Sequence, residues 1–295
     1  MRFVRFGPTG EERAGLLLED GTHRAVDLSV LGHDVDGSFL AALPYDDLMA
    51  LTYQATNIVD LDSVRLGPPI ARPSAIYAIG LNYHDHAKET GMASPSEPIV
   101  FSKSPNSLCG STDDVTLPRG ATRGDWEVEI GVVMGRAVFE LASPDDAVSA
   151  IAGYVAANDV SERRLQLEGG GGQWMRGKSF PTACPLGPWL ATPDILDLGA
   201  AQLTLSVNGE VRQNGVGSDM IFSVPEIVWH MSQYLRLEPG DLVLTGTPAG
   251  VGLGRNPEVF LDDGDVIDIA VTGLGALRNT IRIPPLPQQT TGVTQ

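Results

Sequence analysis

The 295-residue sequence has few cysteines, few basic residues and no long apolar run. Its two cysteines, Cys109 and Cys184, make neither a disulfide framework nor the spacing of a zinc site, so we expect a reduced, cytoplasmic setting. No apolar stretch reaches the length of a membrane span. The first residues have the pattern of a strand and lack the apolar core of a signal peptide, so we expect no membrane association.

Basic residues are scarce: 20 Lys and Arg stand against 37 Asp and Glu, which gives a net charge of −17. A chain this acidic repels nucleic acids and anionic membranes, so neither is expected as a partner. A small anionic substrate would also be repelled at long range and would need a local basic pocket. The basic residues gather at Arg163, Arg164, Arg176 and Lys178.

The sequence predicts a small domain followed by a larger one. Residues 1–70 contain short apparent strands and a helical stretch near Ser38–Leu51, with no cluster that indicates chemistry. Prolines 68, 69 and 73 form a stiff linker, so we place a boundary there. Residues 71–284 read mainly as strands and turns, including a hairpin at Asn208-Gly209, and predict a β-rich α+β fold. The polar tail, 285–295, is expected to be disordered.

An acidic strand is predicted over Asp125–Val133. Alternation places Glu127 and Glu129 on the same side, with Asp125 in line behind them. Two carboxylates roughly 5 Å apart repel by about 3 kcal/mol at an effective dielectric near 20, and a bound Mg²⁺ removes that cost. Asp159, at the end of the next predicted strand, is a candidate third ligand. The alternative is a solvated face on an edge strand.

A short helix is predicted over Asn82–Gly91, with Asn82 as its N-cap and Gly91 as its C-cap. His86 and Glu89 are three residues apart and share a helix face. The carboxylate would orient the imidazole for work as a general base. The alternative is a surface ion pair. A helix this short is marginally stable and suits a movable lid.

A nucleotide-binding loop is the one motif that we reject. Residues Gly172–Ser179 match the P-loop pattern letter for letter, but no apolar strand precedes them and three prolines follow between 181 and 188. Lys178 remains as a candidate site lysine on a loop, and Lys103 faces either a site or solvent. The Gly/Thr-rich loop that contains Thr247 offers N–H groups to an anion, or is an ordinary turn.

These features together indicate one kind of reaction. A metal held by the three carboxylates would chelate the carboxylate and 2-oxo oxygens of a keto acid, and would stabilise the enolate that forms when a neighbouring bond breaks. Lys178 adds positive charge, and His86, oriented by Glu89, activates water or moves a proton.

Several segments carry a resemblance to a known family. They include IGLNYHDHAKE, FSKSPNSL, DWEVEIGVVMGRA, GYVAANDVSERRLQ, QWMRGKSF and PGDLVLTGTPAGVG. From about Ile76 to Thr280 the chain resembles the fumarylacetoacetate hydrolase family. The resemblance implies a mixed β-roll core with peripheral helices behind a small N-terminal domain, a Mg²⁺ or Mn²⁺ site, and a homodimer. It also implies site roles: metal ligands Glu127, Glu129 and Asp159; catalytic His86, Glu89 and Lys178; substrate-binding Arg163, Gln166 and Thr247.

Two departures from the family pattern keep the substrate open. Lys178-Ser179-Phe180 is followed by Pro181 where the family has Asp, and the Gln213-x-Gly215 piece ends in Gly217 instead of Thr. We expect hydrolysis of a C–C bond in a 2,4-dioxo acid, of acylpyruvate or diketo-deoxy sugar acid type, with release of pyruvate or a related 2-oxo acid. Oxaloacetate decarboxylation and 2-hydroxyhepta-2,4-diene-1,7-dioate isomerisation would use the same site. A non-catalytic, metal-dependent 2-oxo acid binder is the alternative of another class.

Overall fold

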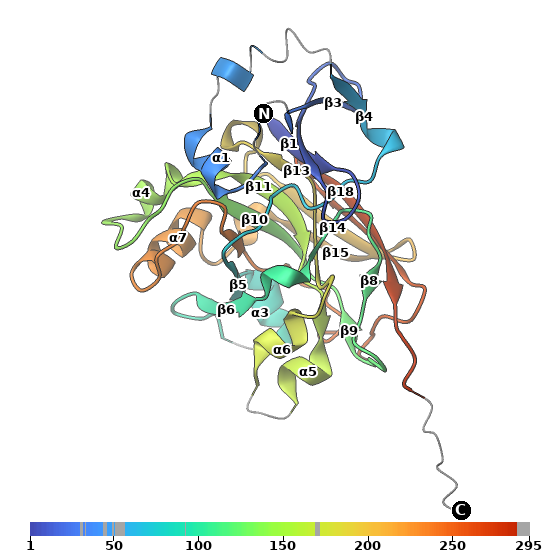
Figure 1. The fold of residues 1–295 in the computed structure, drawn as a ribbon. Coiled ribbons are helices and arrows are strands. Elements are labelled where there is room, and N and C mark those ends of the chain that lie inside the picture. The colour runs from blue at the N-terminus through green and yellow to red at the C-terminus, as the bar shows by residue number, and fades with distance from the viewer. Residues whose placement is uncertain are drawn as a thin grey trace, which may run out of the picture.

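The computed structural model describes residues 1–29, 32, 34–43, 46–48, 50, 57–91, 93–168 and 172–287. Its largest element is a mixed, eleven-stranded sheet through the centre of the molecule (Figure 1). From one edge to the other its strands are β4 (Ile58–Asp60), β3 (Arg24–Asp27), β2 (Arg13–Leu17), β1 (Arg2–Phe6), β13 (Cys184–Ala191), β11 (Ile151–Asn158), β10 (Val128–Met134), β16 (Leu242–Leu244), β5 (Ile76–Gly80) and β6 (Ile99–Lys103), with β7 (Leu108–Cys109) paired to β13.

Two smaller sheets complete the strand structure. The first contains β15 (Glu210–Val216), β14 (Gln202–Val207), β17 (Val266–Val271), β18 (Gly275–Arg282) and β8 (Val115–Thr116), and the second pairs β12 (Ser161–Glu162) with β9 (Gly124–Asp125). The predicted hairpin is confirmed as β14–β15. Both turn residues have positive φ, 51° at Asn208 and 80° at Gly209, as a type I′ turn requires.

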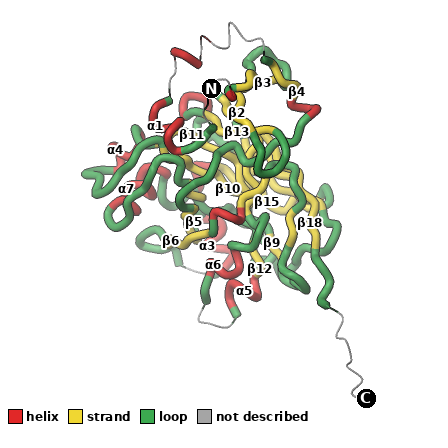
Figure 2. The backbone as a smooth tube through the Cα atoms, in the orientation of Figure 1, coloured by secondary structure: helices red, strands yellow, loops and turns green. Residues whose placement is uncertain are grey.

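The helices are short and lie at the periphery, around the strands (Figure 2). They are α1 (Gly37–Ala42), α3 (His84–Thr90), α4 (Pro144–Val148), α5 (Arg163–Leu167), α6 (Trp174–Lys178) and α7 (Val224–Ser232), with 3-10 turns at Leu61–Ser63, Pro105–Ser107, Pro193–Ile195 and Gly217–Asp219. The helix predicted over Ser38–Leu51 corresponds in part to α1, and residues 44, 45, 49 and 51 lie outside the described residues. A β-rich α+β fold with peripheral helices is confirmed.

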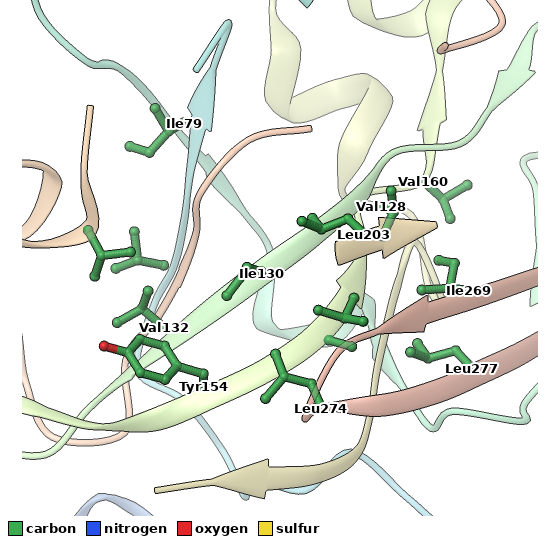
Figure 3. Packing of buried hydrophobic residues seen from close by; sticks show 14 of the residues in the cluster. Ile79, Val128, Ile130, Val132, Tyr154, Val160, Leu203, Ile269, Leu274 and Leu277 are labelled. Carbon is green, nitrogen blue, oxygen red and sulfur yellow. The ribbon is translucent and has the colours of Figure 1, made fainter. Parts of the chain in front are cut away.

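The main hydrophobic core lies between the large sheet and the five-stranded sheet. Val128, Ile130 and Val132 of β10 point into it, and Figure 3 shows them with side chains from the second sheet. Each such fully buried side chain contributes about 1.5–3 kcal/mol. Because strand side chains alternate, Glu129 and Val133 point to the opposite face, where Val133 packs in a second cluster. All seven residues of β10 are buried between β11 and β16, which excludes the solvated edge strand.

The N-terminal strands extend the large sheet. β1 pairs with β13 through Arg2–Ala191 and Phe3–Leu190, although part of this region has a small hydrophobic cluster of its own. The domain boundary near residue 70 therefore stays a prediction, and most of the expected disordered tail, residues 288–295, lies outside the described residues. Among the described helices, none combines the length and apolar character that crossing a bilayer requires.

Candidate active site

Three buried carboxylates come together at the ends of β10 and β11. Glu129 pairs with Ala157 across the ladder, and the N–H of Asp159 donates to the carbonyl of Glu127 at 2.9 Å. This register puts Glu127, Glu129 and Asp159 on one face of the sheet, with ligand oxygens within 4.8 Å of one another. The structure thus brings together the three residues that the sequence predicts as metal ligands.

Two lysines pair with this cluster. Lys178 Nζ lies 2.8 Å from Glu127 Oε2 and 2.6 Å from Asp159 Oδ2. Lys103 Nζ lies 2.7 Å from Asp159 Oδ1 and donates to the carbonyls of Ala183, at 3.1 Å, and of Lys178. Burial alone would lower the pKa of Lys178, but Asp159 and Glu127 outweigh burial and raise it. The sequence left Lys103 undecided between site and solvent, and the structure places it in the site.

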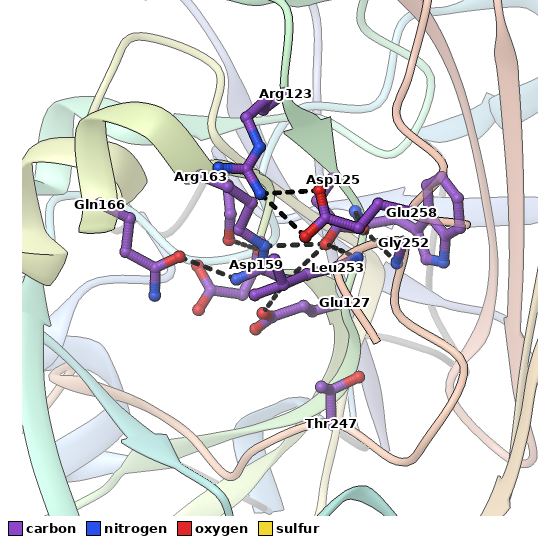
Figure 4. A network of polar contacts seen from close by, with 12 residues as sticks. Arg123, Asp125, Glu127, Asp159, Arg163, Gln166, Thr247, Gly252, Leu253 and Glu258 are labelled. Atoms are coloured by element: carbon purple, nitrogen blue, oxygen red, sulfur yellow. Dashed lines mark hydrogen bonds and ion pairs between the residues drawn. The ribbon is translucent and has the colours of Figure 1, made fainter. Parts of the chain in front are cut away.

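Arg163 connects the cluster to a fourth buried acidic residue, Asp125. Its Nη2 lies 2.7 Å from Asp125 Oδ2 and 2.7 Å from Glu127 Oε1, and its Nη1 donates to Gln166 Oε1 at 2.9 Å (Figure 4). The acidic neighbours outweigh burial and raise the pKa of the Arg163 guanidinium. Arg163 thereby holds one face of Glu127 while Lys178 holds the other.

Asp125 is not in line with the two glutamates, so that prediction is wrong. β9 ends at Asp125 and β10 begins at Val128, and the break between them interrupts the alternation. The oxygens of Asp125 instead accept hydrogen bonds from the backbone N–H groups of Gly252 at 2.7 Å and Leu253 at 3.0 Å. Asp125 therefore ties the loop after β16 to Arg163.

Glu129 is the carboxylate that lacks a cationic partner. Among the described residues it forms no ion pair, and one of its oxygens accepts from Gly246 N at 2.8 Å. Burial, Asp159 and Glu127 raise its pKa well above the usual range. Glu127 differs because Lys178 and Arg163 outweigh burial and lower its pKa. A buried, oxygen-only donor set with one uncompensated carboxylate fits a hard divalent cation.

Close packing of α5 against α6 places the other polar residues. A Cβ at Gly177 would lie 2.5 Å from Gln166 Cβ and 2.6 Å from the carbonyl oxygen of Glu162, so only glycine allows this approach. Lys178 follows as the last residue of α6 and not on a loop, which corrects that prediction. The helix also comes before Ser179, where a P-loop would have its helix after it.

The His86–Glu89 pair lies on α3, with His86 buried and Glu89 half-buried. His86 Nδ1 is 3.2 Å from Glu89 Oε2, and the Glu89 oxygens accept from Gly250 N at 3.0 and 3.1 Å. The side chain of Glu89 thus holds both the imidazole and the loop after β16. The alternative of a pair on a solvated helix surface is excluded, since His86 is only 8% exposed.

The N-cap prediction for this helix is wrong at one residue. The N-cap is Tyr83, while the predicted C-cap Gly91 is confirmed with φ 69°. The side chain of Asn82 instead forms long-range hydrogen bonds. Its Nδ2 donates to the carbonyls of Phe222 and Thr245, and its Oδ1 accepts from Phe222 N. Tertiary hydrogen bonds have overridden the local preference of asparagine for a cap.

Thr247 and Gln213 form a positioning pair. The Thr247 hydroxyl donates to Val128 O at 2.8 Å and accepts from Gln213 Nε2 at 2.8 Å, while Gln213 Oε1 accepts from Val128 N at 2.9 Å. The single O–H of Thr247 is therefore engaged within the protein. Sequence reasoning did not assign Gln213 to the site, although its motif was among the family segments.

The predicted residues surround one cavity of about 130 Å³. Those that line it are His86, Glu127, Arg163, Gln166, Lys178 and Thr247. The other three do not line the cavity but lie next to residues that do: Glu89 contacts His86, Glu129 lies beside Glu127, and Asp159 pairs with Lys178. The cavity thus has a highly charged inner end, and an imidazole also lines it.

Comparison with known proteins identifies the chain. A family model described as fumarylacetoacetate (FAA) hydrolase C-terminal matches residues 75–282. The chain belongs to the fumarylacetoacetate hydrolase family. It is 43% identical over 283 residues to 2,4-didehydro-3-deoxy-L-rhamnonate hydrolase from Sphingomonas sp. (strain SKA58), which covers 95% of this chain and 96% of that protein.

Solved structures of fumarylacetoacetate hydrolase relatives have the same fold. A probable 2-hydroxyhepta-2,4-diene-1,7-dioate isomerase from Mycobacterium abscessus matches with a TM-score of 0.81 and 33% identity, over 97% of this chain and 100% of that one. A maleylpyruvate hydrolase from Sphingobium sp. SYK-6, in complex with manganese(II) ion and pyruvate, matches with a TM-score of 0.79 and 26% identity, over 96% and 100%. The chain is accordingly an enzyme of a family of hydrolases and isomerases.

Proposed function

We propose that this enzyme is a divalent-metal-dependent hydrolase that cleaves the C3–C4 bond of a 2,4-dioxo acid, releasing pyruvate or a related 2-oxo acid. One observation carries the proposal: the carboxylate cluster and the His86–Glu89 pair adjoin the same small cavity. The manganese and pyruvate in the maleylpyruvate hydrolase relative, and the diketo-deoxy sugar acid in the name of the Sphingomonas relative, support it.

Glu127, Glu129 and Asp159 would hold the metal, Mg²⁺ or Mn²⁺. A divalent cation there supplies positive charge that orients the oxygens of a 2-oxo acid and withdraws electron density from them. Lys178 holds two of these carboxylates through two of its three N–H donors, so it fixes their geometry. Its third donor is available to a substrate oxygen, because Lys178 also lines the cavity.

His86 would act as the general base. Its Nδ1 faces Glu89, which places Nε2 on the opposite edge of the ring. Nε2 takes a proton from water while the water oxygen attacks the C4 carbonyl carbon. The C3–C4 bond then breaks, its electron pair passes into the enolate of the 2-oxo acid, and C4 leaves as a carboxylic acid. Protonation of the enolate at C3 gives the 2-oxo acid, and the charge of Lys178 favours this electron flow.

The test uses 2,4-dioxopentanoate as substrate and lactate dehydrogenase to detect pyruvate. Chelator-treated enzyme should be inactive, and Mg²⁺ or Mn²⁺ should restore pyruvate release with equimolar acetate. His86→Asn should lower kcat at least about 100-fold, as expected for loss of a general base. No turnover of any 2,4-dioxo acid with either metal, or full activity of the His86 variant, would refute the proposal.

The same assay separates the alternatives. Oxaloacetate decarboxylation needs no activated water, so a decarboxylase would keep its activity in the His86→Asn variant. An isomerase would change the ultraviolet spectrum of a dienedioate without releasing pyruvate. A non-catalytic binder would bind oxalate together with the metal and turn nothing over. We further propose that the enzyme is a homodimer, which light scattering after gel filtration measures directly.

A further inference from the structure

One part of the wall of the active-site cavity is apolar. It is formed by Leu81, Phe101, Leu167, Trp174, Val251 and Leu253. A substrate that puts its 2-oxo acid end at the charged inner end must therefore extend its C4 substituent along hydrocarbon. The small volume of the cavity, about 130 Å³, favours a short substituent.

This wall is firmly built. The rings of Phe101 and Trp174 pack edge to face with centroids 5.3 Å apart. A Cβ at Gly80 would lie 2.5 Å from the indole, so the Trp174 side chain packs directly against the backbone of β5. The aromatic pair is thus held from two sides and forms a fixed boundary of the cavity.

The basic groups of the cavity are few, and the Lys178 ammonium, 5.2 Å from the centre of the Phe101 ring, lies where the charged lining meets the apolar wall. Among the described residues that line it, the permanent cations are Arg163 and Lys178, and both are paired with buried carboxylates. Lys88, Arg164 and Arg176 are on neighbouring helices, but they are exposed and do not line the cavity. Residues 169–171, which lie outside the described part of the chain between α5 and α6, are glycines and carry no charge.

The charge balance of the inner end points the same way. Five buried carboxylates, Asp125, Glu127, Glu129, Asp159 and Glu162, stand against three buried cations, Lys103, Arg163 and Lys178, which leaves a net charge of −2. A divalent ion would bring this to zero, so no positive charge remains for a second substrate carboxylate. A second carboxylate on the substrate would lie against the apolar wall without a partner, and burying an unpaired charge is costly.

We propose that the substrate is a 2,4-dioxo monocarboxylate whose C4 substituent is short, uncharged and apolar at its end, and that the Leu81–Phe101–Trp174 wall rejects diacids. This inference rests on the proposed function for the reaction itself. It adds the specificity at the C4 end, which family membership leaves open because relatives include enzymes named for diacids.

The test compares two substrates of equal chain length, 2,4-dioxoheptanoate and 2,4-dioxoheptanedioate, which differ only in a terminal methyl or carboxylate. With metal present, kcat/KM for the monoacid should exceed that for the diacid at least about 100-fold. A ratio below about 3, or a preference for the diacid, would overturn the inference while leaving the proposed function intact. No turnover of either compound would instead count against the proposed function.

A charge introduced at the wall sharpens the test. Leu167 is the last residue of α5, is 42% exposed and lines the cavity, so Leu167→Lys should fold and supply the missing cation. The diacid-to-monoacid ratio of kcat/KM should rise at least tenfold. Val148→Lys is the matched control, because Val148 is 55% exposed on α4 and does not line the cavity. An unchanged ratio in Leu167→Lys, or an equal rise in the control, would overturn the inference.

Discussion

Replacing Lys103 with methionine should destabilise the protein by about 3–5 kcal/mol. The Lys103 side chain is fully buried, and its ammonium lies 2.7 Å from the equally buried carboxylate of Asp159. Removing one partner of a buried ion pair leaves an uncompensated charge, which accounts for that magnitude. The unfolding entropy of a 295-residue chain is about 0.6 kcal/mol/K, so a loss of 4 kcal/mol lowers Tm by about 6–7 °C.

The assay is thermal unfolding of chelator-treated protein, with pyruvate release measured in parallel after metal is restored. Lys88→Met is the matched control, because Lys88 is exposed on α3 and the substitution removes the same charge. Its Tm should stay within about 1 °C of the wild type. Activity of Lys103→Met should fall about 10–100-fold, as for other residues that orient metal ligands. A Tm change below 2 °C in Lys103→Met would refute the argument.

A double variant isolates the pair. If the cost of Lys103→Met comes from the charge left on Asp159, then Asp159→Asn should make the same lysine substitution much less costly. We expect the two substitutions together to destabilise by at least about 2 kcal/mol less than the sum of their separate effects. Simple additivity would show that Lys103 acts through packing and not through its charge.

Two further predictions concern other buried groups. Glu129→Gln should raise the Tm of the metal-free protein by about 3 °C at alkaline pH, where Glu129 carries its charge despite its raised pKa, and by less as the pH falls and the carboxyl takes up a proton. It should also abolish the stabilisation that Mn²⁺ gives the wild type. A lower metal-free Tm at alkaline pH would contradict this. Burial raises the pKa of the Cys184 thiol to about 12, so roughly one thiol in 10⁴ is ionised at pH 8. Ellman's reagent should therefore label Cys184 only when the protein unfolds. Labelling of Cys184 in the native protein within minutes would count against the structure.

Local pattern was enough to predict part of the site. Alternation along Asp125–Val133 predicts that Glu127 and Glu129 share a face, because a strand fixes that relation within three residues. The same pattern fails for Asp125, since it assumes one uninterrupted strand where the chain has a break. From the sequence alone, Asp159 is a candidate ligand only because it follows a predicted strand. The register of β10 against β11 is what shows that it lies opposite Glu127.

Contacts between distant segments account for what the sequence did not reveal. Lys103 reaches Asp159 because β6 lies at the edge of the large sheet and its end meets the segment around Ala183, which no local pattern encodes. Asparagine is a preferred helix cap, yet the amide of Asn82 forms hydrogen bonds with backbone carbonyls more than a hundred residues away. The prolines near residue 70 predict a linker, but they carry no information that β1 pairs with β13.

Hydrogen-bond donors distinguish the two buried lysines. The chain has three lysines, and in a protein of net charge −17 two of them are buried at one carboxylate cluster. Lys103 donates to the carbonyls of Ala183 and Lys178, forms an ion pair with Asp159 at 2.7 Å and does not line the cavity, so we expect it to support the cluster and not to contact the substrate. Lys178 donates to Glu127 and Asp159 and lines the cavity, so we expect its third donor to be available to a substrate. A compact ammonium can converge on such closely spaced oxygens where a planar guanidinium cannot, so arginine at either position should fail even though it preserves the charge.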